Sequence, residues 1–122
     1  MVSRTGLKKL IWGVTAIMFV VIGVLTLTPY VGELGPPVSD KVQHFIAFGA
    51  LALPLAVVYP RQILWIFLAA SAYGVLIEFL QPHVGRYYER GDIVADTIGA
   101  ALGVAFGRLI GTQAVLGRLG VR

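Results

Sequence analysis

Four long apolar segments follow one another along the chain, over residues 10–27, 42–59, 62–81 and 93–110. A membrane-spanning helix needs about 20 mostly apolar residues, and a helix that is apolar on all sides is typical of such a span. The first segment is longer than the apolar core of a signal peptide, and no small-x-small cleavage site follows it. The pattern predicts an all-α protein, a four-span transmembrane helix bundle in which the first span is retained.

The polar segments between the four spans differ in length. None of them reads as a linker between separate domains. A loop containing prolines and glycines joins the first two spans, and a tight turn around Pro60 joins the second to the third. A polar loop follows Pro82, and the residues after Gly111 read as a short basic tail. We therefore expect a transmembrane domain over residues 1–111 and a cytoplasmic tail over 112–122.

Charge is scarce in this chain and is divided by side. Charged residues make up 13% of the sequence and cysteine is absent, whereas ordinary soluble domains are about 25% charged. The absence of cysteine excludes disulfides and thiolate zinc sites, and so few charges cannot build a nucleic-acid-binding face. The predicted terminal side carries seven Lys or Arg and no acid, and the other side carries three Lys or Arg and all six acids. The positive-inside rule then predicts both termini in the cytoplasm, N-in and C-in, in a plasma membrane.

Polar residues on three of the predicted helices fall at one depth near the outer side. At about 1.5 Å per residue, His44 and Asp96 lie roughly 6 Å inside their helix starts, and Glu78 lies roughly 24 Å along a helix entering from the opposite side. Ionisable groups within spans face the bundle interior, where lipid does not surround them. We call the predicted set the polar cluster and expect it to form a binding site: Asp40, His44, Glu78, Gln81, Arg86, Asp92 and Asp96.

Glycine recurs every fourth residue in the last span, at Gly99, Gly103, Gly107 and Gly111. Each glycine weakens a helix by about 1 kcal/mol relative to alanine, whereas a stripe of small residues lets helix backbones approach closely. The stripe predicts close helix packing, either within the chain or between copies in a homo-oligomer.

Three segments resemble motifs of VanZ-like membrane proteins. Residues 39–48 resemble their D-K-x-x-H-F-x-x-F segment, and residues 74–81 resemble their G-x-x-x-E-x-x-Q segment. Arg86, Asp92, Gly99 and Gly103 resemble the closing R…D…G-x-x-x-G segment, although Asp96 stands where many relatives carry Asn. The resemblance implies a four-span protein of the bacterial envelope, in a family named for an accessory protein of teicoplanin resistance. It implies no established reaction.

These observations favour an envelope-facing recognition or glycopeptide-resistance accessory role in the bacterial plasma membrane. The expected partners are the lipid bilayer and an envelope lipid, a cell-wall precursor or a glycopeptide; no nucleic acid, cofactor or bound metal is expected. One alternative is a membrane enzyme acting on a lipid-linked substrate, with carboxylates and His44 around a divalent metal. Others are a structural bundle whose polar residues only join helices, and a transporter or proton relay.

Overall fold

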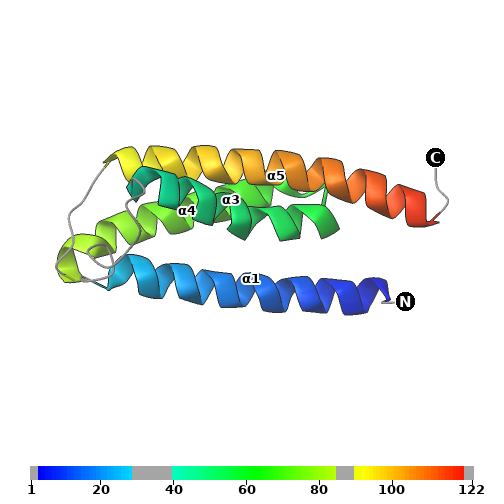
Figure 1. Cartoon of the computed structure of the whole chain (residues 1–122), viewed down its shortest axis with the longest axis horizontal. Coiled ribbons are helices and arrows are strands. Elements are labelled where there is room, and N and C mark those ends of the chain that lie inside the picture. The colour runs from blue at the N-terminus through cyan, green and yellow to red at the C-terminus, as the bar shows by residue number, and fades with distance from the viewer. Residues whose placement is uncertain (1–2, 29–39, 85–89, 120–122) are drawn as a thin grey trace.

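The computed structural model describes the backbone of residues 3–28, 40–84 and 90–119, and the side chains of 3–28, 41–84 and 91–112. Within these ranges the chain forms four long α-helices, which run side by side along the longest axis of the molecule (Figure 1). A short 3₁₀ helix, η1, follows the third of them. The elements are α1 (Arg4–Leu27), α3 (Asp40–Val58), α4 (Ile63–Leu80), η1 (Gln81–Val84) and α5 (Arg90–Leu119).

Each of the four helices is long and apolar enough to cross a membrane, which confirms the predicted all-α, four-span bundle. The start of α1 and the end of α5 lie at the same end of the bundle, together with the α3–α4 turn (Figure 1). We call this end the arginine end, and the opposite end, where α3 and α5 begin, the cluster end. Which end faces the cytoplasm stays a prediction.

The helices begin and end at somewhat different residues from those predicted. Helix α1 begins at Arg4 because the Ser3 hydroxyl caps it, accepting a 2.9 Å hydrogen bond from the amide of Gly6. Helix α4 gives way at Gln81 to η1, which contains Pro82. Helix α5 continues to Leu119, through residues that the sequence predicted to be a tail from position 112 on.

The outward faces of the helices are covered with large apolar side chains. Half or more of the surface of many of these side chains is exposed, among them Ile17, Val20, Ile46, Trp65 and Leu109. Water would disfavour so much contiguous apolar surface on a monomer, whereas hydrocarbon tails solvate it. The buried core, centred on Phe48, Ile77 and Ala100, is small by comparison. This distribution is that of a bundle surrounded by lipid.

Helices α3 and α5 form the closest pair, and the glycine stripe joins them. A Cβ atom built on Gly103 would come within 2.5 Å of the carbonyl oxygen of Gly49 on α3. Gly99, Gly107 and Gly111 meet the carbonyls of Phe45, Leu53 and Val57 in the same way. The two helices are therefore parallel and in register at every fourth residue. The stripe is covered by α3 of the same chain, so a homo-oligomer would have to use another face.

Helix α1 is attached to α4 through a small number of specific contacts. The Tyr73 hydroxyl donates a 2.6 Å hydrogen bond to the carbonyl of Phe19, and the two rings stack with centroids 4.0 Å apart. Gly23 leaves room for that hydroxyl, because a Cβ there would lie 2.7 Å from it. These contacts fix α1 beside α4 at mid-length.

Candidate functional site

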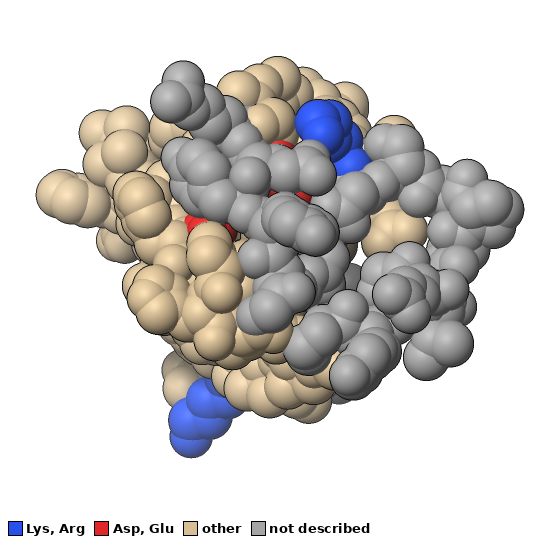
Figure 2. Space-filling view, turned by 90° about the vertical axis from the view of Figure 1, so that its left-hand side faces the viewer, with Lys and Arg blue, Asp and Glu red and all other residues tan. Residues whose placement is uncertain are grey.

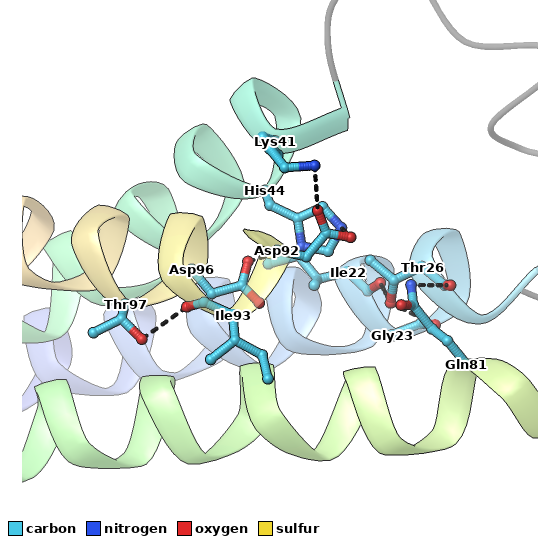
Figure 3. Close-up of polar contacts among 10 residues, drawn as sticks. All are labelled: Ile22, Gly23, Thr26, Lys41, His44, Gln81, Asp92, Ile93, Asp96 and Thr97. Carbon is cyan, nitrogen blue, oxygen red and sulfur yellow. Dashed lines mark hydrogen bonds and ion pairs between the residues drawn. The ribbon is translucent and has the colours of Figure 1, made fainter. Parts of the chain in front are cut away.

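His44 lies between two aspartates of α5 (Figure 3). Its Nδ1 is 2.8 Å from Oδ1 of Asp96, and its Nε2 is 3.5 Å from Oδ2 of Asp92. The aspartates are four residues apart and so share one face of α5; the parallel packing on the glycine stripe brings this face against α3. An ionised carboxylate only accepts hydrogen bonds. The two ring nitrogens of His44 can both donate to ionised aspartates only if the ring is an imidazolium.

Glu78 of α4 completes the group from a third helix. A carboxylate oxygen of Glu78, a ring nitrogen of His44 and a carboxylate oxygen of Asp96 all lie within 4.8 Å of one another. Gly74, one turn before Glu78, makes this approach possible. A Cβ at Gly74 would lie 2.7 Å from Oδ2 of Asp96, so a larger residue would push α5 away from α4.

The group is buried and rich in negative charge. His44, Glu78, Asp92 and Asp96 are at most 4% exposed, and in a view onto the cluster end only small areas of the described acidic atoms are visible (Figure 2). Lys41 is the described cation beside them, with its Nζ 3.9 Å from Oδ1 of Asp92 and half of its side chain exposed. With all three carboxylates ionised, one imidazolium and one lysine leave one excess negative charge among the described side chains. Removing charges from water costs several kcal/mol per ion, so each buried carboxylate depends on a compensating partner.

The N-terminus of α5 stabilises the charge of Asp92 but not that of Asp96. Asp92 lies in the first turn of α5, where the partial positive charge of the helix N-terminus stabilises an anion. Asp96 lies one turn deeper and depends on its side-chain contacts, among them the one with His44. The two aspartates thus differ in what compensates their charge.

Not every predicted member of the polar cluster joins this group. Gln81 is buried but turns toward α1, where its Nε2 donates a 3.0 Å hydrogen bond to the carbonyl of Thr26. Its Oε1 has no hydrogen-bond partner in the part of the chain that is described. Asp40 is the first residue of α3, but its side chain is outside the described set, and Arg86 lies outside the described residues. From here on, the carboxylate–histidine site means His44, Glu78, Asp92 and Asp96.

Lys41 and Gly74 were not among the predicted site residues. Lys41 precedes His44 by three residues and so lies on the same face of α3, which is the signal that could have identified it. Gly74 precedes Glu78 by four residues and so shares a face of α4 with it. Its role depends on how closely α4 and α5 approach, which the sequence does not reveal.

The donor set of the carboxylate–histidine site also suits a metal ion, which the sequence suggested only for the alternative membrane enzyme. His44, Glu78 and Asp96 offer one imidazole nitrogen and two carboxylate oxygens. Such mixed N/O sets bind Zn²⁺, Mn²⁺ and Fe²⁺. A metal on Nδ1 of His44 would leave Nε2 facing Asp92. A carboxylate behind a ligating histidine is the usual means of orienting that ring.

The fold and this site define a class: a small multi-pass membrane protein with a buried carboxylate–histidine site between three helices. Comparison with known sequence families makes the assignment specific. The family described as VanZ/LLP1 matches residues 7–111, and the chain belongs to it. This confirms the resemblance found in the three sequence motifs. Comparisons with curated proteins and with solved structures give no significant match.

Proposed function

We propose that this protein is an envelope-facing recognition protein, which binds the cationic polar part of an amphiphile at the carboxylate–histidine site. Candidate ligands are an envelope lipid, a cell-wall precursor or a glycopeptide, the last giving an accessory role in glycopeptide resistance. The arrangement of Asp92, His44 and Asp96, with Glu78 beside them, carries the proposal. It gathers acids from two helices around one imidazole at one end of the bundle.

Lys41 supports an ammonium group as the recognised feature. The Lys41 Nζ lies 3.9 Å from Oδ1 of Asp92, and about half of the lysine side chain is exposed. The proposed amine would reach this carboxylate along the side on which Lys41 is exposed. A ligand amine would take the position of the Lys41 ammonium or share Asp92 with it. The deeper acids, Glu78 and Asp96, would strengthen its binding through the excess negative charge.

Helix packing alone does not account for the site. Interhelical hydrogen bonds in membrane bundles contribute on average about 0.6 kcal/mol, which is small beside the several kcal/mol needed to bury each charge. The glycine stripe already joins α3 to α5 through direct backbone contact at four successive turns. The pair does not need the two aspartates of α5 to associate. Recognition of a cation gives their burial a role that the packing of α3 on α5 does not require.

Thermal unfolding of the purified protein in detergent, with and without ligand, tests the proposal. The probes are teicoplanin, phosphatidylethanolamine and a polyprenyl-linked cell-wall precursor, each in excess. A ligand at 100 times its Kd stabilises the folded state by about 2.7 kcal/mol, so at least one probe should raise the melting temperature of the wild type. Asp92→Asn keeps the side-chain shape but removes its charge, and should abolish the increase.

Lys9→Gln provides the matched control, because Lys9 is exposed and lies near the start of α1, at the other end of the bundle. It should retain the full ligand-induced increase. The proposal is wrong if none of the three probes stabilises the wild type, or if Asp92→Asn responds as strongly as the wild type does.

Metal-assisted chemistry on a lipid-linked substrate is a second candidate function. One observation favours it: the His44, Glu78 and Asp96 donor atoms lie within 4.8 Å of one another. A divalent ion there would supply Lewis-acid activation of a phosphoryl oxygen. The residues of this chain would hold the ion, and the Asp92 carboxylate would orient the His44 ring. Ligand recognition and ion binding can be separated, because only the second responds to a chelator.

A further inference from the structure

A second polar site lies at the arginine end, far from the carboxylate–histidine site. A cavity of about 590 Å³ opens there between the start of α1, the α3–α4 turn and the later part of α5. Three arginines from these separate segments line it, namely Arg4, Arg61 and Arg108. None of the described residues that line the cavity is acidic. Three like charges that converge without a carboxylate favour an anion between them.

Guanidinium groups are suited to one kind of anion in particular. The planar fork of arginine matches the oxygens of phosphate, and each guanidinium can donate two parallel hydrogen bonds. Thr112 and Gln62, which also line the cavity, add neutral hydrogen-bonding groups. The composition of the cavity is therefore that of a phosphate-binding site.

Aromatic residues place this cavity at the level of the lipid headgroups. The indole of Trp12 donates a 3.0 Å hydrogen bond to the hydroxyl of Tyr59, and the ammonium of Lys8 lies 4.9 Å from the centre of the Tyr59 ring. Trp and Tyr concentrate at membrane–water interfaces, where an apolar ring meets polar surroundings. Tyr59 itself lines the arginine cavity, so the three guanidiniums lie where lipid phosphates lie.

An apolar cavity adjoins the arginine cavity and shares two of its residues. It has a volume of about 410 Å³, and Tyr59 and Gln62 belong to the linings of both. The rest of its lining is hydrophobic: Trp12, Leu55, Trp65, Ile66 and Ala69. A phosphate site beside an apolar cavity matches a phospholipid, which has a charged head and an acyl chain.

We propose that these two cavities together bind one anionic phospholipid. Its phosphate lies among Arg4, Arg61 and Arg108, and one acyl chain follows the groove past Trp12 and Ile66. Basic pockets between membrane helices are a known means of holding anionic headgroups. The site is independent of the function proposed for the carboxylate–histidine site, because the two lie at opposite ends and share no residue.

Native mass spectrometry of the whole protein, released from nanodiscs, tests the proposal. Nanodiscs contain phosphatidylcholine with a minor fraction of phosphatidylglycerol, and the readout is the fraction of protein that retains one phosphatidylglycerol. The wild type should retain this lipid in clear excess over phosphatidylcholine. Arg61→Gln changes an exposed turn residue and should lower retention at least fivefold. Arg108→Lys, which keeps the charge but removes the fork, should also lower it.

Two controls distinguish a defined site from general attraction to a basic surface. Lys9→Gln removes a charge at the same end but outside the cavity lining, and should retain phosphatidylglycerol as the wild type does. Trp65→Ala alters only the apolar groove and should weaken retention as well. The proposal is overturned if Lys9→Gln lowers retention as much as Arg61→Gln. It is also overturned if millimolar inorganic phosphate displaces the lipid and Trp65→Ala has no effect, which would indicate a site for free phosphate.

Discussion

Nδ1 of His44 and Oδ1 of Asp96 lie 2.8 Å apart, although 52 residues separate them in the chain. This contact joins α3 to α5 in the buried part of the bundle. Because an asparagine amide oxygen accepts the same hydrogen bond, Asp96→Asn should leave the folded state within about 1 kcal/mol of wild type. Asp96→Leu leaves a buried imidazole without its acceptor and should lower the free energy of unfolding by about 3 kcal/mol. Denaturant titration in mixed micelles measures both changes, and equal losses for the two variants would contradict this account.

The approach of Gly103 to Gly49 predicts how the stripe responds to substitution. A methyl group on Gly103 would overlap the Gly49 carbonyl, and overpacking of this kind typically costs 1–3 kcal/mol, here about 2 kcal/mol. Gly13 of α1 is the matched control, because a Cβ there meets nothing within 4 Å. Gly103→Ala should lower the melting temperature, whereas Gly13→Ala should raise it slightly through helix propensity. Identical responses of the two variants would mean that the stripe does not limit the approach of α5 to α3.

Divalent ions should stabilise the protein if the carboxylate–histidine site binds metal. Mn²⁺ or Zn²⁺ should raise the melting temperature of the wild type, and EDTA should reverse the increase, because an ion that binds only the folded state stabilises it. Glu78→Gln removes one ligand charge and should reduce or abolish the effect. Thr97→Val changes a neighbouring residue of α5 whose hydroxyl bonds within its own helix, so its response should match that of wild type. The absence of any metal-dependent change in the wild type would rule out the metal-assisted function.

The predicted sidedness can be tested with single cysteines, because the natural chain has none. Thr5→Cys lies at the arginine end and Val84→Cys at the cluster end, and both positions are exposed. In intact bacterial cells, a membrane-impermeant maleimide should label Val84→Cys and leave Thr5→Cys unlabelled until the membrane is permeabilised. The reverse pattern would place the carboxylate–histidine site on the cytoplasmic side and exclude recognition of an external ligand.

Much of the site could be predicted from helix length and rise, but its internal pairing could not. Counting residues from the helix starts was enough to place His44, Glu78 and Asp96 at one depth, since 1.5 Å per residue holds for any helix. Gln81 was expected to share a face with Glu78 at a spacing of three residues. The chain changes to a 3₁₀ helix at Gln81, and the side chain turns to Thr26 of α1 instead.

The partner of the glycine stripe could not be read from the sequence either. Small residues at every fourth position fit a second copy as well as another helix of the same chain. The choice of α3 follows from small residues on its facing side, Gly49 and Ala56, which contact the glycines of α5. Alanines and single glycines are common in any membrane span, so their presence in α3 did not identify it as the helix that packs on the stripe.

The parallel pairing of α3 with α5 has a consequence for biosynthesis. Ribosomes synthesise the chain from its N-terminus, so α3 and α4 enter the membrane before α5 has been made. During that interval His44 and Glu78 lack Asp92 and Asp96, and α3 lacks the glycine face on which it packs. Assembly of the interior must therefore wait for the last span. A nascent chain arrested before residue 90 should expose both polar side chains and be a preferred substrate for membrane quality-control proteases.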